Sequence, residues 1–541
     1  MKTNYIVGHI VDVIDKKIFD GKIIIENGKI TGVIPCSVEK DSPFIMPGFI
    51  DSHIHIESSM LKPSSFASIA VKHGTIGAVC DPHEIANVCG KEGIEFIIED
   101  SKKSNFHFAF TVPSCVPSTN FETSGFTLNS KEVEKLLQRK EMYALAEIMN
   151  YPGVLNKDEE VLKKIDVAHK IGKPIDGHAP CLSGEGLKTY ASYGISTDHE
   201  CSTIIEAEEK LRLGINIIIR QGSAAKNYEA LCNLIDSYPE KIMFCSDDKH
   251  PDDLLKGHIN ELVKESIQRG YNLWNILLAA SYNPIKHYNL PIGLIQKGDS
   301  ADFILVNNLQ DFDVLATYIN GENVLNSIQD AKSSTKTINN FNAKEIDLID
   351  LRVKPLSNII KVIVAEDKEL ITKKTISETK IEDNNVVSNE ENDVLKFIVC
   401  NRYNASKPAI AFIKGFNLKN CALASSIAHD SHNIIAIGTS DKLIQQAVNS
   451  LIAIKGGIIA LDDREQKILP LEIAGLMSNE DAYIVAEKYK VVNEFAKRHN
   501  CAFASPFMTM AFMSLLVIPS LKLSDKGLFD VDKFSFTSLF E

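Results

Sequence analysis

Between about residues 46 and 284 the sequence repeats one pattern, a short apolar run followed by an amphipathic segment. Strands that alternate with helices in this way form βαβ units and favour a parallel sheet. Roughly eight such units over about 240 residues match the length of a (β/α)8 barrel. The repeat therefore predicts an α/β fold with a TIM-like barrel over residues 46–290. The apolar runs after the first are Gly74–Cys80, Phe106–Val112, Met142–Ile148, Lys173–Gly177, Gly194–Asp198, Gly214–Ile219 and Lys241–Cys245.

Short strands are expected on both sides of this region. Near the N-terminus two strand-like runs flank Asn27-Gly28, which is a hairpin signal because both turn residues tolerate a positive φ. Strand-like runs return in Ala301–Val306 and Ala316–Ile319. We therefore expect residues 1–45 and 291–330 to pair in one small β-sandwich domain.

The rest of the chain has strand-like and helix-like segments of its own. We expect residues 340–541 to form a separate C-terminal α/β domain. Within it, residues 367–395 are polar and charged and include the run EDNNVVSNEEND. Such a composition is typical of a loop, so we expect a loop or an insertion over these residues.

Composition excludes several classes of protein. The chain has 58 Lys and Arg against 71 Asp and Glu, and this formal charge of −13 argues against sequence-independent nucleic-acid binding. Its longest apolar stretch, Met508–Ile518, is shorter than the ~20 residues that span a bilayer. The N-terminus lacks the long apolar region of a secretory signal, and the 11 cysteines form no CxxC pair. We expect a cytoplasmic protein with reduced thiols and neither nucleic-acid nor membrane partners.

His53 and His55 end the first apolar run of the barrel region. Side chains two residues apart in a strand lie on one face, so both imidazoles should point the same way. At the C-terminal end of a barrel strand that face opens into the active-site mouth. Two histidines so placed can share a metal ion. For an isolated His-X-His the alternative, two rings that only satisfy polar groups at a strand end, is equally good.

Further ligand-type residues follow at the ends of later strands, namely Glu147, His178, His199 and Asp247. Taken alone, His178 or His199 would more often be a buried histidine whose hydrogen bonds are satisfied. Six candidates at five strand ends are harder to explain in that way. Four histidines and two carboxylates suffice for two divalent ions that share one carboxylate, and a set without thiolates suits Mn²⁺, Fe²⁺ or Zn²⁺.

Longer motifs surround these positions. They are PGFIDSHIHIESS at 47–59, DPHEIANV at 81–88, SDDKHPDDLLKGH at 246–258, ASSIAHDSHNIIAIG at 424–438 and LPLEIAGLMS at 469–478. Together they resemble the adenine deaminase family of the amidohydrolase superfamily. His-X-His marks only the superfamily, whereas DPHEIANV and AHDSHN are more specific. The resemblance covers nearly the whole chain except residues 367–395.

The resemblance implies a metal-bearing barrel, a small β domain and an extra C-terminal domain. By this resemblance His53 and His55 match the metal ligands of the first strand, and His178 and His199 those of the fifth and sixth. Glu147 matches the bridging carboxylate, and Asp247 matches the aspartate of the eighth strand, which binds metal and moves protons. The family favours Mn²⁺ or Fe²⁺ over Zn²⁺, and it suggests a homo-oligomer such as a dimer.

The implied activity is the hydrolytic deamination of adenine to hypoxanthine and ammonia, with water as co-substrate, in purine salvage. A metal-activated hydroxide would attack C6 while Asp247 accepts its proton, with Glu147 and His199 in the catalytic centre. His83 or Glu84 would donate to the ring nitrogens, although a pair that only stabilises the turn after Asp81-Pro82 is an equal alternative. Asp248 is the remaining candidate for contact with substrate.

Other interpretations stay open at this point. Another amidohydrolase could open a cyclic amide or deaminate a pyrimidine, but cyclic-amide relatives commonly use a carboxylated lysine, and residues 141–151 contain none. A non-catalytic relative used as a scaffold would tend to lose metal ligands, and all six remain. The cluster His429-Asp430-Ser431-His432-Asn433 could bind a metal or reach the barrel mouth, but a hydrogen-bonded turn explains it equally well.

Overall fold

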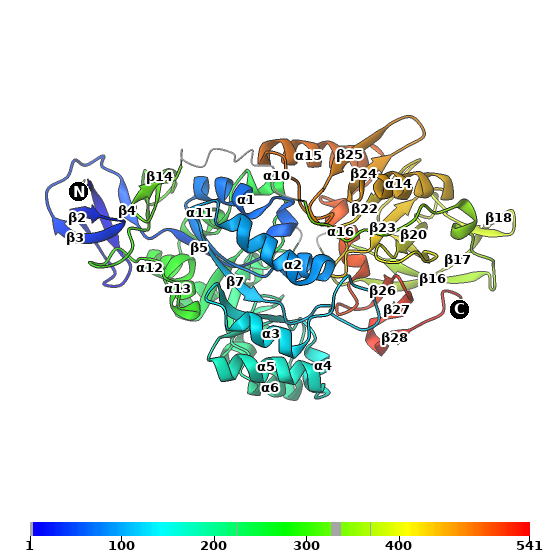
Figure 1. Cartoon of the computed structure of the whole chain (residues 1–541), viewed down its shortest axis with the longest axis horizontal. Helices are drawn as coiled ribbons and strands as arrows, with labels where there is room; N and C mark the ends of the chain where they lie inside the picture. The colour runs from blue at the N-terminus through cyan, green and yellow to red at the C-terminus, as the bar shows by residue number, and fades with distance from the viewer. Residues whose placement is uncertain (1–3, 224, 326–336, 368) are drawn as a thin grey trace.

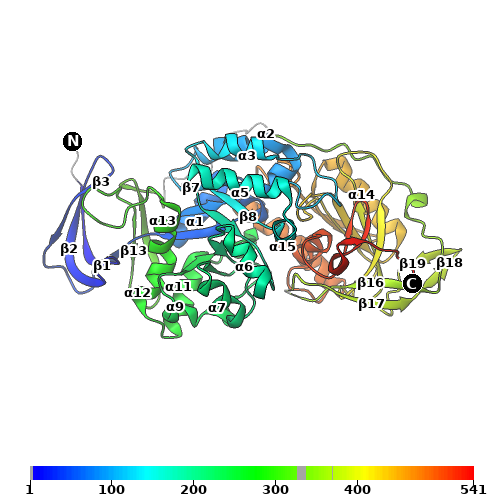
Figure 2. The same ribbon diagram turned by 90° about the horizontal axis from the view of Figure 1, so that it is seen from below.

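The computed structural model describes residues 4–223, 225–325, 337–367 and 369–541. Three parts lie in a row, with a small β sheet at one end, a barrel in the middle and the C-terminal part at the other end (Figures 1 and 2). The chain starts at the far end of the small sheet and finishes at the opposite end of the molecule. Residues 326–330, which we expected at the end of the small β domain, lie outside the described residues.

Eight parallel strands form the central barrel, which confirms the predicted fold class. They pair in two runs, β5 to β9 and β10 to β12. The Ser196 amide donates to the Ile175 carbonyl at 2.8 Å and joins the runs, and a parallel bridge between Ile54 and Asp247 closes the barrel. The strands are β5 (Phe49–Ile54), β6 (Thr75–Cys80), β7 (His107–Val112), β8 (Met142–Ile148), β9 (Ile175–Gly177), β10 (Thr197–Asp198), β11 (Asn216–Arg220) and β12 (Ile242–Cys245).

Helices cover the outside of the barrel strands, which explains why strands such as β6 and β12 are largely apolar and fully buried. Side chains that accept backbone N–H groups start several of the helices, as Asn129, Asp158 and Thr203 do for α3, α5 and α7. The main helices of this region are α1 (Pro63–Ala70), α2 (His83–Ser101), α3 (Ser130–Leu137), α4 (Tyr151–Leu155), α5 (Glu159–Ile171), α6 (Gly184–Ser192), α7 (Ile204–Arg212), α10 (Pro251–Leu254), α11 (Ile259–Gln268), α12 (Leu273–Leu277) and α13 (Asn283–Tyr288).

The small β domain is a seven-stranded sheet in the order β15-β14-β13-β4-β1-β2-β3. It joins the N-terminal strands to those that follow the barrel, and Asn27 and Gly28 turn between β2 and β3 with positive φ. Isoleucines and Phe303 fill its core. The strands are β1 (Asn4–Asp12), β2 (Lys17–Glu26), β3 (Lys29–Pro35), β4 (Phe44–Met46), β13 (Phe303–Val306), β14 (Val314–Ile319) and β15 (Glu322–Asn323).

The C-terminal part contains an eight-stranded sheet in the order β17-β16-β21-β20-β23-β22-β24-β25 and a three-stranded sheet, β26-β27-β28. Helices α14 (Asp441–Ile454), α15 (Ala482–Arg498) and α16 (Pro506–Ala511) accompany them. The strands of the large sheet are β16 (Ile359–Val364), β17 (Lys373–Glu378), β20 (Leu395–Cys400), β21 (Ala409–Lys414), β22 (Ala422–Ser425), β23 (Ile434–Gly438), β24 (Gly457–Leu461) and β25 (Gln466–Pro470). Those of the small sheet are β26 (Leu521–Ser524), β27 (Gly527–Asp530) and β28 (Ser535–Phe536).

The expected loop over residues 367–395 is wrong for much of its length. β17 pairs with β16 over six residues, and β18 (Lys380–Glu382) forms a hairpin with β19 (Asn385–Val387). β17 lies at the edge of its sheet, and most of its side chains are exposed. Charged side chains are common on edge strands because they oppose pairing with other chains, so the polar composition did not exclude a strand. In the described part of the chain, the helices are too short or too polar to cross a membrane.

Candidate active site

The C-terminal ends of the barrel strands bring the six predicted metal-ligating residues together. His53 lies in β5 and Glu147 in β8, while the others follow directly after strand ends. All six side chains are buried, and none is more than 6% exposed. The group consists of His53, His55, Glu147, His178, His199 and Asp247.

Glu147 lies between two pairs of histidines. Its Oε1 is 3.3 Å from Nε2 of His55 and 3.9 Å from Nε2 of His53. Its Oε2 is 2.7 Å from Nδ1 of His178 and 3.2 Å from Nε2 of His199. Each carboxylate oxygen therefore faces one histidine pair, which is the arrangement of a bridging carboxylate.

Asp247 forms ion-pair contacts with the first of these pairs, and one of its oxygens also lies within 4.8 Å of a ring nitrogen of His199. Its Oδ1 is 3.5 Å from Nε2 of His53 and 3.3 Å from Nε2 of His55. Its Oδ2 accepts a hydrogen bond from the Arg220 guanidinium at 2.6 Å. Oδ1 thus faces the two histidines, whereas Oδ2 is held by its hydrogen bond to Arg220.

The donor atoms fit two divalent ions. Nδ1 of His55 is 3.1 Å from the backbone carbonyl of Asp81, which can only accept, so Nδ1 carries the proton and Nε2 presents a lone pair. Such outer hydrogen bonds orient metal-bound histidines. The Nε2 atoms of His53 and His55 lie 3.2 Å apart among carboxylates, as two ligands of one ion would. Imidazole and carboxylate donors suit Mn²⁺, Fe²⁺ or Zn²⁺.

Arg220 is a buried cation that the sequence analysis missed. It pairs with Glu200 and with Asp247, and the Oε1 atom of Glu200 is 3.3 Å from Nε2 of His199. Both residues occupy positions that the strand-end rule covers, because Arg220 ends β11 and Glu200 follows β10 by two residues. Arg220 gives no signal of a metal ligand because a guanidinium cannot bind a cation, whereas Glu200 is a ligand type whose position after β10 could have identified it.

Electrostatics keep the two central carboxyls ionised. Burial alone would raise the pKa of Asp247, but the Arg220 charge and the hydrogen bonds from His53 and His55 outweigh it and hold the pKa well below its usual value. Burial would likewise raise the pKa of Glu147, and the nearby histidines, His178 foremost, lower it far below the ordinary range. Both groups are therefore acceptors at neutral pH.

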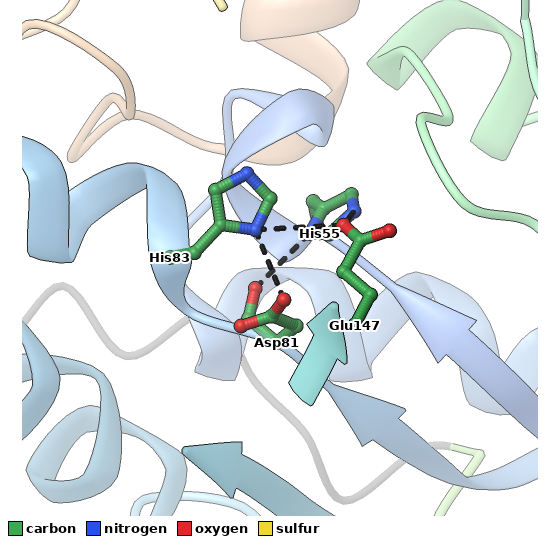
Figure 3. A group of neighbouring side chains, drawn as sticks. All are labelled: His55, Asp81, His83 and Glu147. Carbon is green, nitrogen blue, oxygen red and sulfur yellow. Dashed lines mark hydrogen bonds and ion pairs between the residues drawn. The ribbon is translucent and has the colours of Figure 1, made fainter. Parts of the chain in front are cut away.

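His83 begins α2 and lies beside this group (Figure 3). Its Nδ1 is 3.0 Å from a carboxylate oxygen of Asp81 and 3.7 Å from Oε1 of Glu147. The turn-stabilising contact with Asp81 and the position beside the centre thus both exist. Its Nε2 is buried and makes no hydrogen bond with any described residue.

Glu84 and Asp248 lie on the same side of the site. The Ser58 hydroxyl donates to Oδ1 of Asp248 at 2.6 Å and is 3.0 Å from Oε1 of Glu84. Burial, together with the negative charges of Glu57 and Asp248, raises the pKa of Glu84 well above its usual value. The Glu84 carboxyl therefore holds a proton more readily than an ordinary glutamate does, and in its protonated form it can donate a hydrogen bond.

The C-terminal part covers this site. A cavity of about 20 Å³ lies between the barrel residues and the side chains above them, close to the room one ordered water needs. His429 and Asp430 of the AHDSHN motif do reach the barrel mouth. The other two alternatives stay open, because His432 and Ala428 form a hydrogen-bonded turn and the ligand atoms of Glu84, His429 and His432 lie within 4.8 Å of one another. A purine needs more space than this cavity, so the covering side chains must move for one to enter. Those side chains are Leu370, His429, Asp430, Phe512, Leu515 and Ile518.

Comparisons with known proteins agree along the whole chain. The model of the amidohydrolase family matches residues 44–324, and that of the adenine deaminase C-terminal domain matches residues 369–535. An adenine deaminase of Parabacteroides distasonis is 51% identical over 100% of this chain and 99% of its own length. The adenine deaminase of Methanosarcina acetivorans is 49% identical over 98% of this chain and 99% of its own length. That of Borreliella burgdorferi is 45% identical over 97% of this chain and 98% of its own length. The chain therefore belongs to the adenine deaminase family of the amidohydrolase superfamily.

Proposed function

We propose that this chain hydrolyses adenine to hypoxanthine and ammonia at a centre of two divalent ions and serves the salvage of free purine bases. The observation that carries the proposal is the position of Glu147, with one oxygen facing His53 and His55 and the other facing His178 and His199. The curated relatives that match its full length are named adenine deaminases.

In this proposal His53, His55 and Asp247 would hold one ion, His178 and His199 would hold the other, and Glu147 would serve as a ligand of both. Mn²⁺ or Fe²⁺ is the expected metal, and Zn²⁺ would suit the same donors. Bound ions of this kind lower the pKa of a water molecule towards ~7, which makes hydroxide available at neutral pH.

Asp247 acts as the proton carrier. Arg220 holds its Oδ2, so Oδ1 is the oxygen that can accept the proton of the attacking water. The same oxygen then returns the proton to the 6-amino nitrogen, whose bond to C6 breaks as ammonia leaves. Its lowered pKa keeps Asp247 ready to accept at the start of each cycle.

Glu84 and His83 contact the ring in this account. The protonated Glu84 carboxyl donates to a ring nitrogen as negative charge develops on the purine, and His83 presents its free Nε2 on the same side. Asp248, fixed by Ser58, accepts from a donor on the substrate.

The test is turnover of free adenine by the purified chain, loaded with Mn²⁺ under reducing, oxygen-poor conditions. Ultraviolet absorbance follows hypoxanthine formation, and metal is measured on the same sample. We expect turnover with about two ions per chain, and an Asp247→Asn variant that keeps metal but loses at least 10³-fold in kcat, the upper range for a positioned acid–base group. Two bound ions without turnover of adenine would contradict the substrate, and near-normal turnover by the variant would exclude Asp247 as the proton carrier.

A further inference from the structure

Asp430 brings a carboxylate from the C-terminal part into the active site. It lies in the loop between β22 and β23, and its side chain lines the same cavity as five of the six metal-ligating residues, all but His53. The side chain is buried, with 2% of its surface exposed. A carboxylate placed so deeply needs hydrogen-bond donors, because an unpaired buried charge is strongly unfavourable.

The loop that carries Asp430 is held on both sides. The Tyr403 hydroxyl donates to the Ser431 carbonyl at 2.6 Å, and the Asn433 amide group donates to the Thr123 carbonyl of the barrel at 2.9 Å. The backbone N–H of His429 donates to the Ala511 carbonyl at the end of α16 at 3.1 Å. The position of Asp430 above the barrel is therefore fixed by its neighbours.

The two oxygens of Asp430 differ in their partners among the described residues. Oδ1 forms ion pairs with Nε2 of His83 at 3.7 Å and with Nδ1 of His429 at 3.8 Å, both longer than a hydrogen bond. Its Oδ2 has no hydrogen-bond partner among the described residues, and the same holds for Oε2 of Glu84 and Nε2 of His83. His83 and Asp430 thus each present an unpartnered buried polar atom at residues that line the cavity, which points to a polar ligand there.

Asp430 is separated from the metal-ligating group by the His83 side chain. The His83 ring lies between them, with Nδ1 3.7 Å from Glu147 and Nε2 3.7 Å from Asp430. In adenine the reacting atom C6 belongs to the six-membered ring, and N9 lies on the far side of the fused five-membered ring. A base whose C6 lies at the metal-ligating group therefore directs its N9 edge away from that group, towards the wall that carries Asp430.

We propose that Asp430 determines specificity for the free base, because its carboxylate accepts a hydrogen bond from the N9–H of the purine. This inference rests on the proposed deamination of adenine. A nucleoside carries a sugar at N9 and has no hydrogen there, so it leaves Oδ2 of the buried carboxylate without a hydrogen-bond donor and also needs more space. Sites built to bind a substrate N–H reject analogues that lack it strongly, by a factor of about 10⁴ or more.

The experiment compares adenine with 9-methyladenine in the wild type, in Asp430→Ala and in Asp463→Ala, a control at an exposed aspartate. We expect Asp430→Ala to lower kcat/KM for adenine about 10- to 100-fold, mainly through KM, as loss of a charged hydrogen bond does. The weak reaction of 9-methyladenine should change less than about threefold, because it never makes the bond. Metal content should stay at the wild-type level in every variant.

Inhibition by products gives a second readout that needs no turnover of the analogue. Hypoxanthine should inhibit the wild type more strongly than 9-methylhypoxanthine does, and Asp430→Ala should remove the difference. An equal loss of kcat/KM for adenine and for 9-methyladenine in Asp430→Ala would show that Asp430 only positions His83, and this would overturn the proposal. An unchanged kcat/KM for adenine in Asp430→Ala would overturn it as well. Failure of the wild type to deaminate adenine would instead contradict the proposed function, while the binding difference would still report on Asp430.

Discussion

Glu147 connects the two halves of the site, because its oxygens face different histidine pairs. Replacing Glu147 by Gln keeps the shape but turns one ligand oxygen into an NH₂ group, which cannot bind a metal ion. We predict that Glu147→Gln binds about one ion per chain or fewer and loses at least about 10³-fold in kcat, because the ions prepare the nucleophile. The measurement is metal analysis together with adenine turnover.

Glu141 offers a matched control for this change, since it precedes the same strand and is paired at the surface with Arg139. Glu141→Gln should keep both metal content and turnover. Two ions per chain and ordinary rates in Glu147→Gln would show that Glu147 is not a shared ligand.

Arg220 is the buried cation that compensates Glu200 and Asp247. Removing one partner of a buried ion pair leaves uncompensated charge and typically costs about 3–5 kcal/mol. We predict that Arg220→Met lowers the free energy of unfolding of the barrel by an amount of this order and lowers kcat, because Asp247 loses its support. Arg220→Lys keeps a positive charge but loses the forked geometry of the guanidinium, so its free energy of unfolding and its kcat should lie between those of Arg220→Met and the wild type. Chemical denaturation of both variants measures this, and equal stability of Arg220→Met and the wild type would contradict the role.

At the level of elements, β26 binds two of the segments that cover the active site. The Lys522 amine donates to the backbone carbonyls of Leu370 and Phe512, each at 2.9 Å, and both residues line the cavity. Burial lowers the pKa of Lys522 to about 7. The two covering segments therefore depend on one buried amine, which loses its charge near neutral pH.

This lowered pKa predicts a pH dependence of stability. Between about pH 7 and the ordinary lysine value near 10.4, the unfolded chain binds a proton that the folded chain does not. The free energy of unfolding contributed by Lys522 should therefore rise with pH across this window, by at most ~1.4 kcal/mol per pH unit. Denaturation at pH 7 and pH 9.5 measures the free energy of unfolding of the wild type minus that of Lys522→Met, and this difference should increase with pH. For a Met substitution at the exposed Lys407, the same difference should not change with pH. A constant difference for Lys522→Met as well would refute the lowered pKa.

The elements differ in how well the sequence predicts them. The strands of the barrel are buried on both faces, so most of them are largely apolar, as β6 and β12 are, and this leaves a clear pattern in the sequence. β17 is held by backbone hydrogen bonds to β16 at the edge of a sheet, and its exposed side chains carry little sign of the strand. The apolar runs therefore predicted the buried strands of the barrel, whereas polar composition led us to expect a loop at residues 373–387, where the structure has strands.

At the level of the whole molecule, the active site forms between two parts of the chain. Barrel residues come from strand ends, and a local rule is enough to find them, as it was for His53, Glu147 and Asp247. The position of Asp430 depends on contacts between residues hundreds of positions apart, such as that of Asn433 with Thr123. A single sequence contains no local pattern for such contacts. The AHDSHN motif therefore offered a contact with the barrel mouth as one alternative, but the position of Asp430 could not be predicted.

The most direct test of the central claim is the anomalous X-ray diffraction of crystals of the Mn²⁺-loaded protein, measured at the manganese edge. The account predicts two peaks, one beside His53, His55 and Asp247 and one beside His178 and His199, with Glu147 in contact with both. A single peak, or two peaks that do not share Glu147, would contradict it.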